Sequence, residues 1–334
     1  MSEDVTSVSS EDIVAAYRMF LGRKPSVQEV SIWQGIRSLA ERRAAFLESA
    51  EFMANQRHAA NGKDSANQPK AAPEKLSGNL PGADVEWQTD AATTSRLLKH
   101  VKQTWTALGE SRPHWSVLSS DHFLPERIAQ NEKAFFDSGK HALAALTSAL
   151  RRHGVSSNLN VYEFGCGIGR VTAYLARTFP QVTACDISKS HLVKARQLLA
   201  DRKNVKFKLV EDDRFAMTEP FDLWTSFIVL QHNPPPIIAM ILARMFMKLA
   251  RGGLAIFQVP TYCLGYRFKV AEYLSGGALD GAIEVHCLPQ SVIFSLAHQA
   301  GCVALEVREN DAMGPPSLWL SNTFIFRKPP RPKP

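Results

Sequence analysis

The chain has 334 residues, enough for one large domain and a smaller one. Its hydrophobic fraction of 45% is ordinary for a globular protein, and the absence of an apolar run long enough to cross a bilayer argues against a membrane span. The net charge of +7 does not favour a nucleic-acid partner, because Arg327, Lys328, Arg331 and Lys333 near the C-terminus supply four of those charges.

The N-terminus and the cysteines indicate the setting in which the protein works. Residues 1–4 read Met-Ser-Glu-Asp, which is too polar and acidic for a signal peptide. The five cysteines are scattered and form no C-x-x-C pair, so neither a zinc site nor a disulfide framework is indicated. We therefore expect a cytoplasmic protein without a metal site.

Residues 1–56 predict a small all-α module. Apolar residues recur at helical spacing, and Ser26 with Glu29 forms a capping box at the start of a second helix. A further pattern is formed by Tyr17, Leu21, Gly22, Arg23, Pro25, Trp33, Phe46, Ser49, Glu51 and Phe52. This pattern resembles a short bacterial domain of unknown function, often attached to glycosyltransferases and methyltransferases of cell-surface polysaccharide synthesis. Such a module could also dock to a protein partner.

The next part of the chain predicts a linker and then a helical region. Residues 57–85 are rich in small and polar side chains, which is typical of a flexible linker. Residues 86–154 predict helices that pack over a ligand crevice, including a long helical stretch from about 125 to 153. Residues 329–334 form a basic tail. The apolar stripe of the first helix in this region comprises Leu97, Val101, Trp105 and Leu108.

From residue 159 the chain alternates between short apolar runs and amphipathic segments. This alternation predicts an α/β fold with a parallel sheet covered on both faces, over residues 155–328. An irregular insertion is expected from Pro260 to about Glu284. Strands are predicted at 159–164, 182–186, 204–210, 221–228, 253–259, 302–309 and 319–327, and helices at 169–178, 189–201, 235–250 and 289–300.

A glycine turn follows the first predicted strand. Gly165, Gly167 and Gly169 let the chain turn sharply and leave bare main chain for a ligand, next to a helix start near Arg170. Helix N-terminal N–H groups favour a carboxylate, and Glu163 supplies the opposite charge. A ligand with both an ammonium and a carboxylate, such as the methionine end of S-adenosylmethionine, suits this pair, whereas a pyrophosphate would be repelled.

The ends of the next strands carry further polar residues. Asp186 lies about 20 residues beyond the turn, where a carboxylate can receive both hydroxyls of a ribose. Asp212 ends the third strand and could accept a hydrogen bond from an adenine amino group. The fourth strand leads into Leu230-Gln231-His232. Because ligands in such folds bind beyond the carboxyl ends of the strands, these residues are expected to converge on one crevice.

These residues together resemble a class I S-adenosylmethionine-dependent methyltransferase. The resemblance implies a Rossmann-like, seven-stranded, mostly parallel sheet with an antiparallel last strand, and S-adenosylmethionine as cofactor. By the same resemblance Glu163 and the glycines hold the methionine part, Asp186 the ribose and Asp212 the adenine. The implied cofactor-binding residues are Glu163, Phe164, Gly165, Cys166, Gly167, Gly169, Asp186, Ile187, Asp212 and Phe227.

The segments around His114–Leu118 and Glu284–Pro289 resemble a bacterial subgroup of these enzymes that is often linked to polysaccharide or glycolipid genes. This resemblance implies O-methylation of a sugar, glycan or other small acceptor. Three alternatives remain: a non-catalytic protein that binds S-adenosylmethionine and docks to a partner, an RNA methyltransferase, and a nicotinamide dehydrogenase. The last is disfavoured because its G-x-G-x-x-G fingerprint would need a glycine at the place of Arg170.

Two histidines are candidates for the base that an oxygen nucleophile needs. His286 is preferred because it lies in the variable segment on the substrate side, and His232 follows the fourth strand. Either could instead have a structural role, His232 as a helix cap or pocket wall and His286 as a loop residue. Tyr262, Tyr266 and Arg267 in the insertion are candidate substrate contacts, with ordinary loop packing as the alternative.

Overall fold

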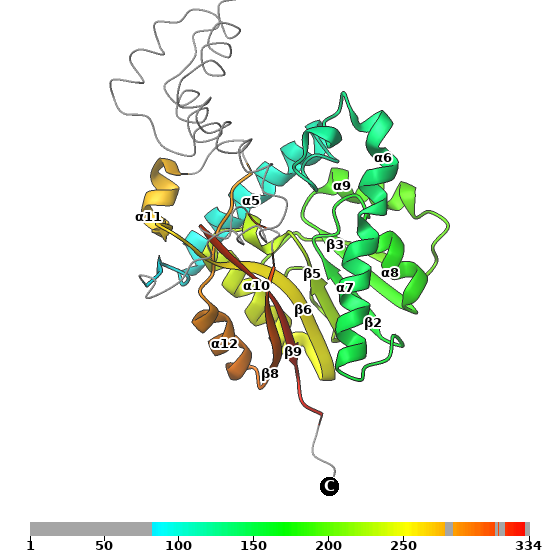
Figure 1. Ribbon diagram of the computed structural model, residues 1–334. Helices are drawn as coiled ribbons and strands as arrows, with labels where there is room; N and C mark the ends of the chain where they lie inside the picture. The colour runs from blue at the N-terminus through cyan, green and yellow to red at the C-terminus, as the bar shows by residue number, and fades with distance from the viewer. Residues whose placement is uncertain (1–81, 278–282, 311–312, 314–317, 331–334) are drawn as a thin grey trace, which may run out of the picture. The chain divides into compact units, whose positions relative to one another are not determined.

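The computed structural model describes residues 82–277, 283–310, 313 and 318–330 (Figure 1). The predicted helical module at 1–56, most of the predicted linker at 57–85 and the end of the basic tail lie outside the described residues. The chain divides into two units at Ala71 and Ala72, and every described residue belongs to the second. Everything below concerns that second unit.

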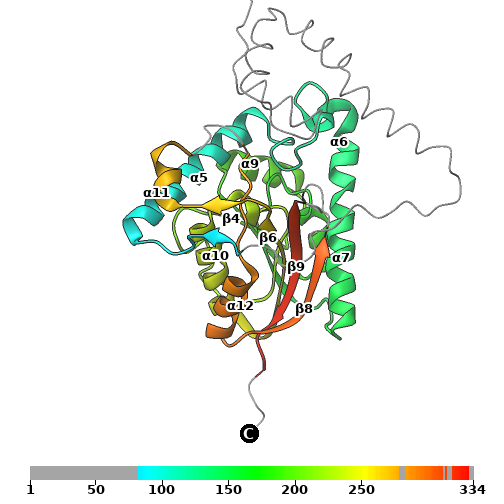
Figure 2. The ribbon, with the colours of Figure 1, turned by 60° about the vertical axis from the view of Figure 1, so that its left-hand side comes forward.

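A seven-stranded sheet forms the centre of this unit, in the order β4-β3-β2-β5-β6-β9-β8. The first five strands along the chain run parallel, and β9 is antiparallel to both of its neighbours. This confirms the predicted fold class. Because β9 lies between β6 and β8, the antiparallel edge of the sheet is β8, as Figure 2 shows, and the opposite edge is β4. The strands are β2 (Asn160–Phe164), β3 (Gln181–Asp186), β4 (Val205–Leu209), β5 (Phe221–Ser226), β6 (Leu249–Cys263), β8 (Val303–Asn310) and β9 (Trp319–Arg327).

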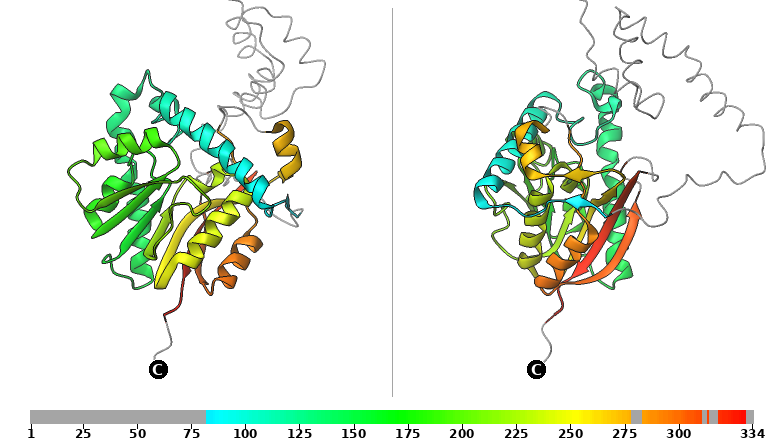
Figure 3. Two further views of the ribbon diagram at one scale, coloured as in Figure 1. Left: turned by 180° about the vertical axis from the view of Figure 1, so that it is seen from behind. Right: turned by 90° about the vertical axis from the view of Figure 1, so that its left-hand side faces the viewer.

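Helices cover both faces of the sheet. Successive side chains of a strand point to opposite faces, so strands that are apolar throughout give the sheet two apolar faces that must be buried. In β6, Leu254 and Ile256 pack in one core cluster, and Ala255 and Phe257 pack in the other. Figure 3 (left) shows α5, α10 and α12 in front of the sheet. The helices of this face are α5 (Ala91–Ser111), α10 (Pro235–Lys248) and α12 (Gln290–Gln299); those of the other core cluster are α7 (Gly139–Arg152), α8 (Thr172–Thr178) and α9 (Lys189–Leu198).

The long helix predicted at 125–153 is two helices, α6 (Ile128–Asp137) and α7, which meet at Ser138. Gly139, at the start of α7, packs closely on the next loop, since a Cβ atom there would lie 2.3 Å from the carbonyl oxygen of Arg170. A residue with a side chain could not allow this close approach. The junction is thereby held against the loop that contains Arg170. A short 3-10 turn, η1 (Asp121–Phe123), precedes α6.

The predicted irregular insertion contains more regular structure than the sequence indicates. The strand β6 continues to Cys263, because its extra residues pair with β9 beyond a register shift between Pro260 and Tyr262. Asp84–Val85, which the composition places in the linker, form β1 and pair with β7 (Arg267–Phe268). The insertion then continues as α11 (Val270–Glu272) and the π-helical turn η3 (Tyr273–Gly277).

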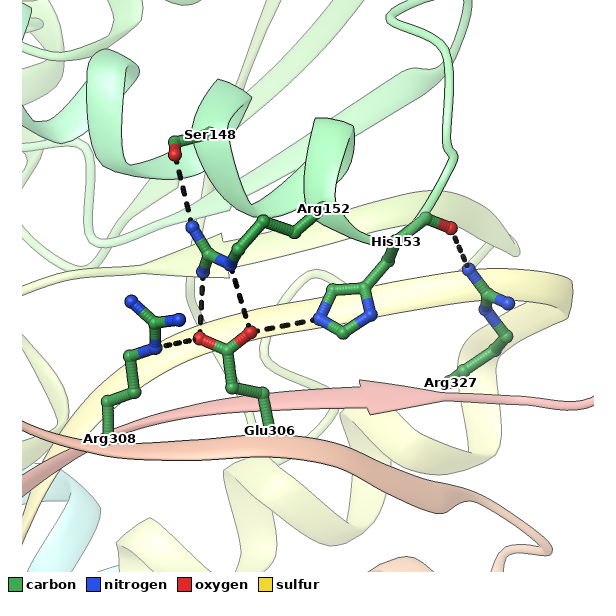
Figure 4. Close-up of polar contacts among 6 residues, drawn as sticks. All are labelled: Ser148, Arg152, His153, Glu306, Arg308 and Arg327. Atoms are coloured by element: carbon green, nitrogen blue, oxygen red, sulfur yellow. Dashed lines mark hydrogen bonds and ion pairs between the residues drawn. The ribbon is translucent and has the colours of Figure 1, made fainter.

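A carboxylate surrounded by basic groups fastens α7 to the edge of the sheet (Figure 4). Arg152 donates from Nε to Oε2 of Glu306 at 3.1 Å and from Nη2 to Oε1 at 2.7 Å. His153 Nε2 lies 3.1 Å from Oε2, and Arg308 pairs with Oε1. Arg327 of β9 donates to the carbonyl oxygen of His153 at 3.0 Å. We call Arg152, His153, Glu306 and Arg308 the Glu306 cluster.

Candidate active site

A cavity opens at the carboxyl ends of β2, β3 and β5, where the three strand ends meet. The turn after β2 forms its floor, and α5 with the segment at Ser116 and Val117 forms the opposite wall. The charged residues lining it are Glu163, Arg170 and Asp186, and the rest of the lining is mostly apolar. Further lining residues used below are Leu98, Val101, Trp105, Gly165, Gly167, Ile187, His191, Val210, Phe215, Phe227, Ile228 and His232.

The glycine turn is built as its sequence predicts. Gly165 and Gly167 have φ angles of 77° and 54°, in the left-handed region that side chains disfavour. A Cβ atom at Gly165 would lie 2.4 Å from Val229, and one at Gly167 would lie 2.7 Å from Val117. Both glycines line the cavity, and the side chains of Val229 and Val117 pack directly on their main chain. Phe164 and Cys166 also line the cavity, whereas Gly169 is not among the lining residues.

Glu163 lies at the floor of the cavity and is 5% exposed. Thr172, in the first turn of α8, donates a hydrogen bond of 2.6 Å to its Oε2. Burial raises the pKa of Glu163 to about 7, and the Thr172 hydroxyl and the charge of Arg170 lower it by less. A cationic group in the cavity would favour the ionised carboxylate.

Arg170 is a charged lining residue that the sequence analysis did not select. It is 7% exposed, and its Nη1 donates to Ser138 Oγ at 3.0 Å. Its buried Nε has no hydrogen-bond partner, and burial lowers the pKa of the guanidinium while Glu163 raises it. An anionic group entering the cavity could accept from this side chain. The sequence offers one indication of this role, because Arg170 directly follows the glycine turn.

Asp186 lies where the sequence predicts, at the end of β3 and in the same cavity as Glu163. Its Oδ2 accepts from the N–H of Gly167 at 2.8 Å, and its Oδ1 accepts from the N–H of Ser188 at 2.8 Å. His191, which the sequence analysis did not select, lines the cavity with its Nε2 2.9 Å from Ser116 Oγ. Its Nδ1 lies 3.6 Å from Oδ1 of Asp186.

Asp212 is not brought to the cavity. Its carboxylate pairs with Arg214, whose Nε donates to Oδ2 at 2.7 Å, and its side chain is 40% exposed. The hydrogen bond from Arg214 lowers the pKa of Asp212. The lining in this part of the chain comes instead from the apolar residues Val210 and Phe215. Ile187 and Phe227, both predicted cofactor contacts, do line the cavity.

His232 lines the cavity from η2 (Leu230–His232). Its Nδ1 lies 2.8 Å from the carbonyl oxygen of Glu284. Since a carbonyl can only accept, Nδ1 carries the proton and Nε2 carries a lone pair. Burial lowers the pKa of His232 to about 4, so the ring is neutral near pH 7. The ring of Trp105 lies 5.3 Å from it, centroid to centroid.

The remaining candidates do not line the cavity. His286 is 6% exposed, and both of its ring nitrogens have protein partners, Tyr266 Oη at 2.9 Å and Glu284 Oε2 at 3.0 Å. Arg267 is exposed and pairs with Glu272. Tyr262 pairs with Leu320 in the antiparallel ladder. The geometry therefore favours His232 over His286 as a base, the reverse of the order that the sequence suggests.

Among the residues that the structure describes, no group of three or more His, Cys, Asp or Glu side chains could hold a metal ion. Within the same part of the chain, no helix combines the length and the apolar character that crossing a bilayer requires.

Part of the chain is similar to known methyltransferases. Residues 161–253 match the family model described as a methyltransferase domain, which covers β2 to the start of β6. The chain is 30% identical over 122 residues to a malonyl-[acyl-carrier protein] O-methyltransferase of Bacillus anthracis, covering 35% of this chain and 44% of that protein. It is 34% identical over 100 residues to a trans-aconitate 2-methyltransferase of Deinococcus radiodurans, covering 30% and 37%. The matched segment thus spans less than half the length of these relatives.

Solved structures with a similar fold include two methyltransferases. One is the N-methyltransferase NodS of Bradyrhizobium japonicum in complex with S-adenosyl-L-homocysteine, with a TM-score of 0.45, 20% identity, and coverage of 68% of this chain and 99% of that one. The other is the magnesium protoporphyrin IX methyltransferase of Synechocystis with bound S-adenosylhomocysteine, with a TM-score of 0.49, 17% identity, and coverage of 69% and 98%.

Proposed function

We propose that this chain, whose residues 161–253 match a methyltransferase domain, is an S-adenosylmethionine-dependent methyltransferase that methylates an oxygen atom of a small acceptor. One observation carries the proposal: Glu163, the bare glycine turn and Asp186 line a single cavity. A sulfonium amino acid joined to a ribose presents the complementary groups, an ammonium, a carboxylate and two hydroxyls.

The lining residues fit the cofactor group by group. Glu163 receives the ammonium, and Arg170 with its unpartnered Nε receives the carboxylate. Asp186 accepts from the ribose hydroxyls. The adenine lies among apolar side chains, with Ile187 and Phe227 as its contacts. The predicted contact of Asp212 with the adenine remains a prediction that requires its carboxylate to leave Arg214.

S-adenosylmethionine supplies an activated methyl group, so the protein mainly aligns the acceptor with it. With the cofactor bound, its sulfonium would give up the methyl group as the new bond to the acceptor oxygen forms, and His232 would accept the hydroxyl proton at Nε2. The positive charge would pass from the sulfonium to the imidazole, so the net charge of the cavity would not change. This balance suits a base whose pKa is lowered by burial.

The acceptor class is the finer part of the proposal. A sugar or glycan is supported by the resemblance to enzymes linked to polysaccharide synthesis. An acyl acceptor is the second candidate, because the relatives include a malonyl-[acyl-carrier protein] O-methyltransferase. The wall of α5 offers Leu98, Val101 and Trp105, which suits an acceptor with an apolar face.

Transfer of labelled methyl from S-adenosylmethionine to a panel of sugars, glycans, carboxylic acids, acyl carriers and RNA tests the proposal. We expect turnover of an oxygen acceptor, with kcat lower by about 10²–10⁴-fold in His232→Gln and cofactor affinity retained. Cofactor binding without turnover on any acceptor would instead support a non-catalytic binding protein, and methylated RNA would support the RNA alternative.

The proposal extends to the organisation of the whole protein. We propose a helical module at 1–56, a linker at 57–85 and a methyltransferase domain at 86–328, in a cytoplasmic protein whose module docks to a protein partner. A partner captured by the full chain and lost on deletion of residues 1–56 would support the docking role.

A further inference from the structure

A second polar cluster lies beside the cavity, in the insertion after β6. It is centred on the side chain of Glu284, and we call Tyr266, Tyr273, Glu284 and His286 the Glu284 cluster. Its members come from the loop before β7, from η3 and from the segment before α12. The mechanism above uses none of these side chains, and none of them lines the cavity.

Hydrogen bonds join the side chains of the cluster to one another. Tyr266 Oη lies 2.9 Å from His286 Nδ1, and His286 Nε2 lies 3.0 Å from Oε2 of Glu284. Tyr273 donates to the same oxygen at 2.6 Å. Burial raises the pKa of both tyrosines, so both hydroxyls keep their protons near pH 7. His286 thus links the Tyr266 hydroxyl to the carboxylate that Tyr273 also contacts.

The cluster is tied to the cavity through main chain rather than through side chains. The carbonyl oxygen of Glu284 accepts from Nδ1 of His232 at 2.8 Å. Two residues later, the N–H of His286 donates to the carbonyl oxygen of Gln231 at 2.7 Å. The segment at 284–289 has neither helical nor strand structure, so these main-chain bonds and the side-chain contacts of the cluster together fix where its carbonyl lies.

We propose that the Glu284 cluster is a positioning device: it holds the Glu284 carbonyl against His232 and thereby keeps the proton on Nδ1 and the lone pair on Nε2, facing the acceptor. The catalytic consequence rests on the proposed function, but the tautomer itself does not. A neutral imidazole in water slightly prefers the proton on Nε2, and that tautomer could not act as a base at this nitrogen. The carbonyl reverses the preference, and the cluster keeps the carbonyl in place.

Histidine labelled with ¹⁵N reports the tautomer of His232 directly by NMR, with His232→Gln to assign its signals. In the full-length wild type near pH 7.5 we expect a pyrrole-like Nδ1 and a pyridine-like Nε2, in about tenfold excess over the other tautomer. In Glu284→Gln, and to a smaller extent in Tyr273→Phe, we expect the excess to fall, on the order of fivefold for Glu284→Gln.

Two matched controls lie outside the cluster. Glu306→Gln removes a carboxylate of another cluster, and Tyr174→Phe removes a hydroxyl that donates to Asp137; both should leave the His232 signals unchanged. Tyr273→Phe is the milder variant should Glu284→Gln fail to fold. A wild type with the proton mainly on Nε2, or an unchanged ratio in folded cluster variants, overturns the inference.

The outcome is separable from the proposed function. Affinity for S-adenosylhomocysteine should stay within about twofold in Tyr273→Phe, since the cluster does not line the cavity. A wild type that does not bind this ligand would remove the proposed function and leave the tautomer result standing. With an acceptor in hand, Glu284→Gln should lower kcat more than it raises KM.

Discussion

Two glutamates of this protein, Glu163 and Glu306, have opposite electrostatic surroundings. Glu306 belongs to β8, next to the end of α7, and pairs with Arg152, His153 and Arg308. Burial raises the pKa of Glu306, but the hydrogen bonds from Arg152 and His153 lower it by more. The resulting pKa lies below the usual value of a glutamate. Glu163 is buried beside the Thr172 hydroxyl, and the charge of Arg170 offsets only part of the effect of burial, so its pKa is raised to about 7.

The source of the counter-charge distinguishes the two carboxylates: Glu306 has a structural role, and Glu163 is suited to bind a cationic ligand. The protein itself supplies the counter-charges of Glu306, and these contacts hold a helix to the edge of the sheet. At Glu163 a cationic group of a ligand can supply what the protein leaves out, and binding energy is gained where charge compensation is incomplete. The predictions below compare these two regions.

The largest effect is expected from Gly167→Ala, which places a methyl group 2.7 Å from Val117 at a φ of 54°. Backbone strain and overpacking together should cost about 2–4 kcal/mol of unfolding free energy and displace Val117, which lines the cavity. Gly154→Ala is the matched control beside the Glu306 cluster, because its φ is 66° and no atom lies within 4 Å of its Cβ. It should cost about 1 kcal/mol by denaturant unfolding and leave ligand binding intact.

Glu163→Gln should weaken binding of S-adenosylhomocysteine by about 10–100-fold, because a hydrogen-bonded charge is replaced by a neutral amide of the same shape. Glu306→Gln, which makes the same change in the other region, should leave the affinity unchanged. Calorimetric titration of both variants checks the pair. Equal affinities in the two variants would show that Glu163 does not contact the ligand.

Glu306→Gln should instead lower the unfolding free energy by about 1–2 kcal/mol near pH 7, since it weakens the contacts with Arg152 and Arg308. Glu163→Gln should cost less, because the ionised carboxylate is itself disfavoured by burial. Urea unfolding monitored by circular dichroism measures both values. A larger loss for Glu163→Gln would contradict the division into structural and ligand-binding carboxylates.

The two glutamates should also have opposite effects on stability as pH changes. Glu163 has a raised pKa, so its contribution is fully present below its unfolded value of 4.5 and is lost as pH rises through about 7. Glu306 has a lowered pKa, so its contribution is present above 4.5 and is lost as pH falls through the folded value. The free energy of unfolding, measured across pH, checks this. Glu163→Gln should remove only the loss of stability on the alkaline side, and Glu306→Gln only the loss on the acidic side.

The smallest effect is expected from Asp212→Asn. Its side chain is 40% exposed and its carboxylate is paired with Arg214, so we expect cofactor affinity within about twofold of wild type. A loss of tenfold or more would show that Asp212 leaves Arg214 and binds the adenine, as the sequence pattern suggests.

The sequence predicts the floor of the cavity better than its walls. Glu163, the glycines and Asp186 follow strands that their own residues specify, so their place at one edge of the sheet follows from local pattern. Asp212 also follows a strand, but a neighbour two residues away takes its carboxylate, and spacing does not encode that competition. His286 is predicted in the substrate-side segment, yet its side chain is used inside the Glu284 cluster.

Some residues that line the cavity are not predicted from the sequence, because they belong to helices whose apolar pattern indicates only packing. Trp105 belongs to the apolar stripe of α5, which long-range packing brings over the strand ends. His191 reads as part of an ordinary amphipathic helix, and Arg170 as the start of another. Their functional position depends on contacts such as the one between Gly139 and Arg170, which only the folded chain reveals.

Calorimetric titration of the full chain with S-adenosylhomocysteine, in two buffers of different ionisation enthalpy near pH 6, tests the central claim most directly. We predict saturable one-to-one binding with release of a fraction of a proton, because the ammonium of the ligand lowers the pKa of Glu163 from about 7. A folded sample that gives no binding heat, or that binds and takes up protons, would contradict the account.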